Sequence, residues 1–267
     1  MAKSAKYEEG SGVAPQIETP WTIYIPRTLS EIKGETVLLK ISGESLSGEG
    51  GFGLKREPIY DICSEINSVA ESHRIAIVNG GGNWARGPDI EKNITLRKTP
   101  AADELGMLAT VMNALVLEDV LERDFGRTAR VMSAREMSDF CEPYIRKRAI
   151  RHLEKGRIII LPCGMGVPNF STDMAMVNRA KELGVGIILK GTKVDGIYNK
   201  DPRTQKGARF IPEISYRQYI MKDLKIVDPA AVRQAQDMGI EIRVFNLFVK
   251  GNLKRVLTEK SIGSVIH

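Results

Sequence analysis

Two lysines stand at the ends of predicted buried strands, where a protein can bind a ligand. Lys40 lies near the end of the apolar run 36–41, and Lys190 ends the run 187–190. Nearly continuous apolar runs are typical of strands buried on both faces of a parallel sheet. Open α/β sheets bind ligands beyond the carboxyl ends of their strands, so we expect both ammonium groups at one ligand site. For Lys40, the alternative is a side chain that only reaches water from the edge of the sheet.

Three consecutive glycines follow another predicted strand, over 74–79. Gly80, Gly81 and Gly82 leave bare backbone N–H groups that can form an anion-binding nest. Arg86 follows one helical turn later, and its guanidinium group can place two donors on the same phosphate. The combination indicates a phosphate site. A glycine-rich turn beside a surface arginine is the alternative.

The segment 162–173 joins a further glycine turn to the start of a helix. Ser171 and Thr172 are candidate N-caps of the helix that the pattern predicts over 172–183. The free N–H groups and the positive end of such a helix favour an anion. Asp173 would place a carboxylate at the same point, which makes sense if a lysine or another cation is also present. An ordinary capped loop between a strand and a helix is the alternative.

The segment 48–53 matches the pattern G-x-G-x-x-G, which occurs in dinucleotide-binding proteins. In that fingerprint the glycines follow a strand directly and open a helix. Here other residues separate the strand 36–41 from Gly48, so we predict a flexible loop before a helix over 56–72. The sequence contains no G-x-x-x-x-G-K-[ST] pattern, which excludes a phosphate loop of the Walker type.

Composition narrows the class of protein. The chain has 267 residues, of which 42% are hydrophobic and 27% charged, as in a soluble globular protein, and no apolar run approaches the roughly 20 residues that span a membrane. Glu8 and Glu9 in a polar N-terminus argue against a targeting peptide. Cys63, Cys141 and Cys163 are widely spaced and odd in number, which predicts free thiols in the cytoplasm. Few histidines and scattered cysteines predict no metal site built from protein side chains alone.

The net charge of +6 indicates an anionic partner. The densest basic run, 146–152, alternates with apolar residues at helical spacing, so we interpret it as a solvated helix face. Binding of nucleic acid is the alternative, but such proteins usually also carry aromatic platforms or a known motif. We therefore expect no nucleic-acid partner and no membrane partner.

Predicted strands alternate with predicted helices along the chain. The strands cover 36–41, 74–79, 128–132, 157–161, 187–190 and 241–245, with 264–266 as a final edge strand, and the helices cover 56–72, 103–121, 144–155, 172–183 and 229–238, with a short one around 219–220. This order predicts an α/β fold with a mostly parallel central sheet between layers of helices. Residues 1–34, with three prolines, are expected to form a partly disordered extension, in which 21–25 form a short strand or pack on a neighbour. Residues 35–267 are expected to form one domain.

Asp103 and Tyr198 each have two interpretations. Asp103 begins a long helix that is apolar on more than one face, so this helix lies in the core or is buried against another subunit. Its carboxylate either favours the helix start or grips sugar hydroxyls. Tyr198 follows the strand that ends in Lys190, and its ring either stacks on a flat ring of a ligand or covers the sheet.

Several phosphate sites in one protein indicate phosphoryl transfer between two anionic substrates. Such substrates repel each other, and charge spreads over the moving group in the transition state. Catalysis then depends mainly on neutralisation and in-line positioning, with little need for a nucleophilic side chain. We expect Mg²⁺ on the donor phosphates, where it bridges their oxygens.

Five motifs occur together and in one order. They are LKISGE at 39–44, GGGN with RG at 80–87, ADELGMLATVMNAL at 102–115, EPYIRKRAIRHLEKGR at 142–157, and LKGTKVDGIY with DP at 189–202. With them, residues 35 to 267 resemble the bacterial-type uridylate (UMP) kinases of the amino-acid kinase superfamily. The resemblance implies an amino-acid kinase-like fold and the reaction ATP + UMP → ADP + UDP in pyrimidine nucleotide synthesis. It also implies a cytoplasmic homohexamer that uses Mg²⁺ with ATP, is activated by GTP and is inhibited by UTP.

The resemblance also implies roles for individual residues. The catalytic set would be Lys40, Arg86, Asp173 and Lys190, in which Asp173 would orient the lysines or the metal, and no residue is assigned as a metal ligand. ATP would contact Lys40, Ser42, Gly43, Gly82, Arg86, Thr192, Tyr198 and Asp201. UMP would contact Gly81, Asp103, Met165, Gly166, Val167, Phe170, Ser171 and Thr172. GTP would act at Gly48, Gly50, Gly51, Phe52 and Gly53. The acceptor side would lie mainly in 35–185 and the ATP side mainly in 186–267.

The chain departs from this family in the acceptor loop. The family usually has Gly-Thr-Gly-Asn-Pro-Phe-Phe-Thr-Thr-Asp, whereas Met165 and Val167 here replace a hydroxyl and an amide, and Asn169 replaces a phenylalanine. Lost polar partners in such a loop can change discrimination by a few kcal/mol. A kinase of this fold with another small acceptor, such as a carboxylate, carbamate or phosphate, is therefore an alternative. A non-catalytic nucleotide-binding protein is a second one, although the intact catalytic set argues against it.

Overall fold

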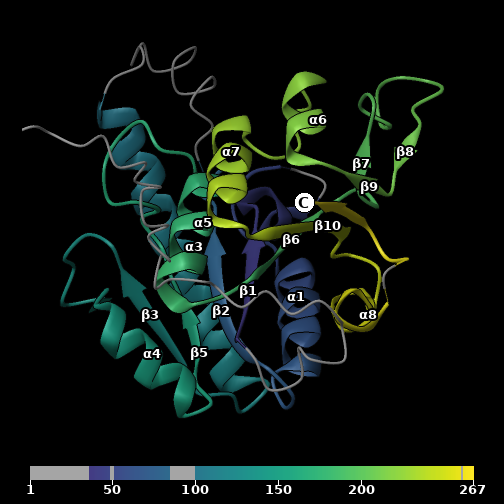
Figure 1. The fold of residues 1–267 in the computed structure, drawn as a ribbon. Helices are drawn as coiled ribbons and strands as arrows, with labels where there is room; N and C mark the ends of the chain where they lie inside the picture. Colours follow the sequence, from purple (N-terminus) through teal and green to yellow (C-terminus); the bar gives the residue numbers. More distant parts are fainter. Residues whose placement is uncertain (1–35, 49–50, 85–99, 260) are drawn as a thin grey trace, which may run out of the picture.

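The central sheet joins strands from both halves of the chain. The computed structural model describes residues 36–48, 51–84, 100–259 and 261–267 (Figure 1). The strands are β1 Thr36–Ile41, β2 Arg74–Asn79, β3 Ala129–Ser133, β4 Glu142–Pro143, β5 Ile158–Ile160, β6 Ile187–Thr192, β7 Ile197–Tyr198, β8 Phe210–Ile211, β9 Glu213–Ile214, β10 Glu241–Asn246 and β11 Ser264–Ile266. Nine of them form one sheet in the order β4-β3-β5-β2-β1-β6-β10-β11-β9, while β7 and β8 form a separate antiparallel pair.

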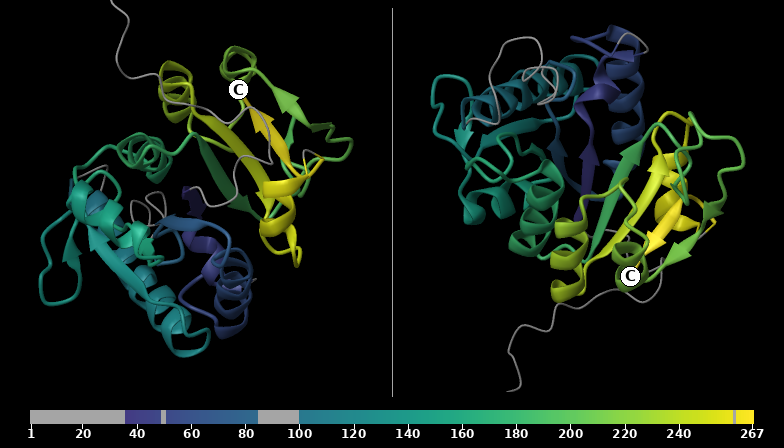
Figure 2. Two further views of the ribbon diagram at one scale, coloured as in Figure 1. Left: turned by 60° about the horizontal axis from the view of Figure 1, so that its bottom comes forward. Right: turned by 90° about the horizontal axis from the view of Figure 1, so that it is seen from above.

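Helices cover both faces of this sheet (Figure 2). They are the 3₁₀ helix η2 Gly43–Leu46 and the α-helices α1 Arg56–Val69, α3 Pro100–Arg123, α4 Arg146–Glu154, α5 Thr172–Leu183, α6 Tyr216–Met221, α7 Pro229–Met238 and α8 Asn252–Thr258. Successive residues of a strand point to opposite faces. Leu39 and Ile41 accordingly pack with α1, α3 and α8 in one apolar cluster. Leu38 packs with α4, α5, α6 and α7 in the other.

The order of the strands changes direction between β1 and β6. From β1 the sheet continues through β2, β5 and β3 to β4, and from β6 it continues through β10 and β11 to β9. The helix after β1 packs in one apolar cluster, whereas α6 and α7, which follow β6, pack in the other. In both views of Figure 2 the purple-to-teal segments and the yellow C-terminal segments occupy different ends of the molecule. Open α/β sheets bind ligands at such a switch point.

The predicted mostly parallel sheet is confirmed, with differences at its margins. The strand predicted as a final edge is β11, but it is not the edge, because β9 pairs with its outer side. The strands β4, β7, β8 and β9 were missed, since two residues are too few to show an alternation. Helix α3 begins three residues before Asp103. Residues 1–34 lie outside the described residues.

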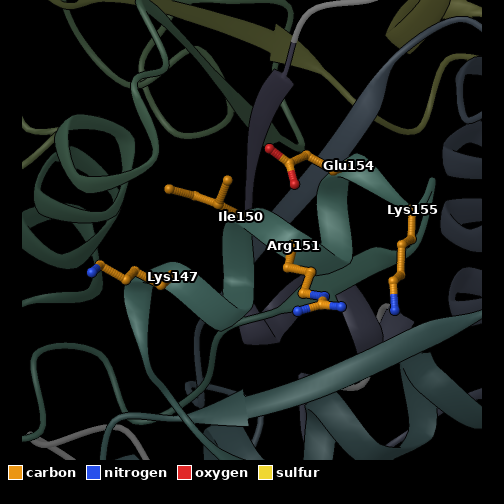
Figure 3. A pocket seen from close by; sticks show the side chains of 5 residues that line it. All are labelled: Lys147, Ile150, Arg151, Glu154 and Lys155. Carbon is orange, nitrogen blue, oxygen red and sulfur yellow. The ribbon is translucent and has the colours of Figure 1, made fainter.

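The basic run forms the outer face of α4, as predicted. Arg146, Lys147, Arg148 and Arg151 are exposed, while Ala149 and Leu153 face the core. Figure 3 shows Lys147, Arg151 and Lys155 around an open hollow that Glu154 also lines. A carboxylate within the basic surface and the contact of Arg148 with Glu142 at 3.7 Å are typical of a solvated helix face.

Candidate active site

Two lysines and one aspartate meet at the switch point of the sheet. Lys40 of β1 and Lys190 of β6 are direct partners in the parallel register, so both side chains leave the same face. Asp173, in the first turn of α5, lies between them. Its Oδ1 is 2.9 Å from Nζ of Lys40, and its Oδ2 is 2.5 Å from Nζ of Lys190. Each of the three side chains is at most 10% exposed.

The cluster concentrates charge where water is excluded. Like charges on neighbouring strands repel, and burial disfavours each of them. Burial alone would raise the pKa of the Asp173 carboxyl, but the two lysines outweigh it and hold that pKa well below its ordinary value. Burial and the charge of Lys40 lower the pKa of Lys190 to about 8, against the opposing effect of Asp173. These three side chains alone thus place two basic groups and one acidic group together, an excess of positive charge that favours phosphates nearby.

The turns after β1 and β2 are packed backbone to backbone. A Cβ atom on Gly43 would stand 2.5 Å from Oδ1 of Asn83 and 2.6 Å from the backbone nitrogen of Gly82. A Cβ on Gly81 would stand 2.7 Å from the Cβ of Ala109 on α3. Both distances are shorter than real Cβ contacts, so only glycine fits at these two positions. The predicted glycine turns therefore form one cradle, which we define as residues 42–43 and 80–82.

A buried pair of asparagines holds this cradle against α3. Asn83 and Asn113 donate to each other's side-chain oxygens at 3.0 and 2.7 Å, and neither side chain is exposed. Asn113 also donates to the carbonyl of Gly80, and Trp84 donates to Asn113. Buried amides whose partners are all in place fix a single arrangement. The motif around 102–115 contains Asn113, but its hydrogen-bonding role could not be deduced without the fold.

The acceptor loop, residues 163–171, has an unusual backbone. Cys163 and Asn169 have positive φ angles of 64° and 67°, as do the loop's two glycines. The N–H of Cys163 donates to Oγ1 of Thr110 at 2.7 Å, and the N–H of Asn169 donates to Oδ2 of Asp103 at 2.7 Å. Both partners lie on α3. Asp103 thus reaches the predicted acceptor site, although here its carboxylate holds the loop.

The same loop brings the other predicted acceptor residues together. Ser171 caps α5 by accepting the N–H of Met174 at 3.2 Å, whereas Thr172 is the first residue of the helix; of the two candidates, Ser171 is the cap. Met165 is half-buried against the core, while Val167 and Phe170 are 48% and 50% exposed. Gly166 lies against the carbonyl of Ala134, which a Cβ would approach to 3.0 Å.

The predicted ATP residues Thr192, Tyr198 and Asp201 lie at the end of β6 and in the separate β7–β8 pair and its turn. Thr192 ends β6 and donates to the carbonyl of Val194 at 2.7 Å. Tyr198 in β7 meets Phe210 edge to face, with ring centroids 5.4 Å apart, so its ring packs on the β7–β8 pair. Asp201 accepts from the backbone and the guanidinium group of Arg203.

The segment 48–53 is only partly described, and its described residues contact Asn83 and Trp84, which follow the cradle directly. Gly53 donates to the carbonyl of Asn83 at 2.8 Å, and Phe52, 69% exposed, meets Trp84 edge to face. Lys193, directly after β6, donates to the carbonyl of Gly48 at 3.0 Å. The segment therefore bridges the two halves near the switch point. Gly50 and Arg86 lie outside the described residues.

Asp228, the residue before α7, lies at the site but was not predicted from the sequence. Its backbone N–H donates to Oδ2 of Asp173 at 3.0 Å. Its Oδ1 accepts the N–H of Ala230, so Asp228 is the N-cap of α7, followed by Pro229 at the first helical position. An aspartate followed by proline at a helix start is a recognisable N-cap signal. The signal predicts the cap but not that it lies beside Asp173.

Among the described residues, no cluster of three or more His, Cys, Asp or Glu side chains could hold a metal ion. Both carboxylate oxygens of Asp173 are within ion-pair distance of lysine ammonium groups.

None of the described helices is long and apolar enough to cross a membrane.

Comparisons with known proteins agree with this arrangement. The model of the amino acid kinase family matches residues 35–246. The chain is 42% identical over 240 residues to the uridylate kinase of Xanthomonas oryzae pv. oryzae, which covers 90% of this chain and 99% of that protein. The UMP kinase structure from Bacillus anthracis matches with a TM-score of 0.82 and 32% identity, over 87% of this chain and 95% of that one. The UMP kinase structure from Ureaplasma parvum matches with a TM-score of 0.79 and 29% identity, over 88% and 99% of the two chains.

These matches confirm the resemblance inferred from the five motifs. The family model extends over both halves of the sheet, from the start of β1 to the end of β10, and so includes the Lys40–Asp173–Lys190 cluster. The relatives match over nearly their whole length. This protein belongs to the amino acid kinase family.

Proposed function

We propose that this protein is a UMP kinase, which transfers the γ-phosphoryl group of ATP to UMP and releases ADP and UDP. The observation that carries the proposal is the buried Lys40–Asp173–Lys190 cluster at the switch point of the sheet. Two buried cations beside two glycine-rich turns suit a reaction in which both substrates carry phosphates. Relatives named as uridylate and UMP kinases support UMP as the acceptor.

The transfer depends on neutralising charge. An oxygen of the UMP phosphate attacks the γ-phosphorus, the bond from that phosphorus to the bridging oxygen breaks, and ADP leaves with the electron pair. The attacking oxygen is already ionised near neutral pH, because the second pKa of a phosphate monoester is about 6. No side chain needs to remove a proton. Lys40 and Lys190 stabilise the charge of the transition state, and Asp173, with both oxygens engaged, holds them in place.

The two halves of the sheet suit the two substrates. We assign the acceptor mainly to residues 35–185 and ATP mainly to residues 186–267, with the cradle between them. The proposed ATP contacts are Lys40, Ser42, Gly43, Gly82, Arg86, Thr192, Tyr198 and Asp201. The proposed UMP contacts are Gly81, Asp103, Met165, Gly166, Val167, Phe170, Ser171 and Thr172. Arg86 completes the proposed catalytic set on the strength of its motif alone.

Mg²⁺ would reach the site with ATP. It prefers oxygen ligands and is commonly held by substrate phosphates, water and one or two carboxylates. Both oxygens of Asp173 lie within ion-pair distance of lysine ammonium groups, so we assign the ion to the phosphates of ATP and to water. When bound, it neutralises part of the phosphate charge. The chain's own residues then orient the phosphates around it.

We further propose that copies of this chain associate through α3, as part of a homohexamer. Leu105, Leu108 and Met112 on α3 are 41–46% exposed, and with Phe140 they line a largely apolar hollow of about 950 Å³. Exposed apolar patches of this kind mark contact surfaces. Leu108→Glu should then lower the molecular mass measured by light scattering.

We also propose that GTP binds at residues 48–53 and that UTP inhibits the reaction. Adding each nucleotide in increasing amounts to the activity assay would test these two proposals.

A coupled assay of ADP release tests the proposed reaction. Mg-ATP is combined with UMP, CMP, dUMP, AMP or GMP, and Asp173→Asn serves as the inactive control. Turnover that depends on UMP supports the proposal. ATP consumption with none of the nucleotides overturns it.

The acceptor loop motivates one other function. Met165 and Val167 bring thioether and hydrocarbon groups to positions where the family has a hydroxyl and an amide, and Val167 is exposed toward solvent. A kinase of the same fold for a different small acceptor would retain the lysine cluster and change this loop. A panel of carboxylate, carbamate and phosphate acceptors separates this function from UMP phosphorylation.

A further inference from the structure

Asp228 connects the start of α7 to the start of α5 through three different groups. Its backbone N–H donates to Oδ2 of Asp173 at 3.0 Å, and its Oδ2 accepts the hydroxyl of Ser171 at 2.5 Å. Its Oδ1 accepts the N–H of Ala230 at 2.9 Å and caps α7. Ser171 in turn caps α5 by accepting the N–H of Met174. The starts of α5 and α7 are thus hydrogen-bonded to each other through Asp228, and Asp173 extends these contacts to Lys190.

We propose that Asp228 is a positioning residue for phosphoryl transfer, which fixes the carboxylate of Asp173 and thereby the two lysine ammonium groups. The proposal rests on the proposed function only for the identity of the reaction. The structure assigns the contacts of Asp228 independently of which acceptor the protein uses.

The geometry separates this role from ordinary helix capping. An N-cap aspartate needs one carboxylate oxygen for its own helix, and Oδ1 fulfils that requirement. The second oxygen and the N–H point to α5 instead, toward Ser171 and Asp173. Oδ2 of Asp173 receives both the N–H of Asp228 and Nζ of Lys190, so its position depends on both donors. A carboxylate free to rotate would no longer hold the two lysines at fixed positions.

Asp228 also contributes charge to the site. The groups that face Lys190 are Lys40 from β1, Asp173 from α5 and the carboxylate of Asp228, while β10 places the apolar Val244 beside it. The hydroxyl of Tyr219 on α6 is bonded to the backbone of Val227. Burial lowers the pKa of Lys190, and the negative charge of Asp228 is one of the effects that raise it. Neutralising Asp228 should therefore lower the pKa of Lys190 further.

The test compares Asp228→Asn with two matched controls. Asparagine keeps the backbone N–H to Asp173 and one oxygen for the cap of α7, but it removes the charge and the second carboxylate oxygen, which accepts the hydroxyl of Ser171. Asp237→Asn removes the same charge from an exposed position on the same helix. Ser215→Ala removes the serine N-cap of α6, whose hydroxyl oxygen accepts the N–H of Gln218 in its own helix. Thermal unfolding of each variant shows whether a change of activity follows from a loss of stability.

We expect Asp228→Asn to lower kcat roughly tenfold to a hundredfold, the scale for a slightly misplaced catalytic group. The KM values for ATP and UMP should change far less, and the alkaline limb of kcat should move to lower pH. Both controls should keep the kcat and the pH profile of the natural protein. An unchanged kcat and pH profile in Asp228→Asn, or equal losses in the controls, would overturn the proposal.

A second measurement does not depend on turnover. Lysine labelled with ¹³C at Cε reports the titration of Lys190, whose resonance is assigned by its absence in Lys190→Arg. A lower pKa in Asp228→Asn and an unchanged one in Asp237→Asn support the proposal, and equal values in both overturn it. If the natural protein does not phosphorylate UMP, the proposed function fails while this titration still decides the role of Asp228.

Discussion

The cradle and the acceptor loop both belong to the proposed active site, but they are built differently. The cradle is held by buried amides and by glycines that admit no side chain. The acceptor loop has positive φ angles at Cys163 and Asn169, and it exposes Val167 and Phe170. The first region offers backbone N–H groups in one fixed arrangement, whereas the second offers side chains that can be exchanged. We therefore propose that backbone geometry fixes the binding of phosphate, and that replaceable side chains set the choice of acceptor.

The largest effect is expected at Asp173, which follows the acceptor loop and contacts Lys40, two residues before the cradle. Asp173→Asn would leave two buried lysines without their counterion, and removing one partner of a buried ion pair is strongly destabilising, by about 3–5 kcal/mol. We expect kcat to fall at least a thousandfold, measured by ADP release. Circular dichroism and thermal unfolding check that the variant is folded. A folded Asp173→Asn protein with normal turnover would remove Asp173 from the mechanism.

A side chain introduced into the cradle should be the next most damaging change. Gly43→Ala would place a Cβ 2.6 Å from the nitrogen of Gly82, so the two turns must separate. We expect a loss of about a hundredfold in kcat/KM for ATP, the scale of a small misplacement. The control is Gly126→Ser in the turn after α3, where the added Cβ meets nothing within 4 Å. The glycine at 126 has a positive φ of 66°, so its substitution costs stability without touching the cradle. Equal activity losses in the two variants would contradict the steric role of Gly43.

The pH dependence of turnover should report the titration of the lysine cluster, and it should depend on neither the cradle nor the acceptor loop. Because the pKa of Lys190 is lowered to about 8, its ammonium group is charged at neutral pH and loses its proton above that value. We expect kcat to stay level near pH 7 and to fall about tenfold per unit above the pKa, as a single deprotonation requires. Saturating substrates separate kcat from KM in this measurement. A level profile up to pH 10 would show that the charge of Lys190 is not needed.

The acceptor loop should give the smallest effect, confined to the choice of acceptor. The double variant Met165→Thr, Val167→Asn restores the polar groups that the family usually carries. Each hydrogen bond to a neutral group contributes about 1 kcal/mol, so we expect the two restored groups together to change the KM for UMP by about thirtyfold or less. The KM for ATP should stay the same. A change in the KM for ATP would show that the two regions are not independent.

The sequence predicted the frame of the site more completely than its interior. The apolar runs that carry Lys40 and Lys190 at or near their ends predicted two buried strands. That these strands are neighbours, with Lys40 opposite Lys190, is known only from the fold. The glycine pattern predicted turns, but the contact between Gly43 and Gly82 depends on residues far apart in the sequence. Sequence periodicity cannot predict the two-residue strands, which are too short to show an alternation. It also cannot predict the hydrogen bond from Asp228 to Asp173, because these residues are 55 positions apart. The assignments of individual contacts to ATP, UMP and GTP remain predictions.

The pairing of β1 with β6 also constrains how the protein can move. The two halves are joined at their centre by a parallel ladder from Leu38–Ile188 to Ile41–Gly191. A hinge in a flexible linker is therefore not available at this junction, because opening the halves there would break backbone hydrogen bonds. Closure around two substrates must instead twist a continuous sheet by small amounts or move the loops at its rim. The two halves should accordingly move as one continuous sheet that bends, and they should not rotate about a hinge as separate rigid bodies.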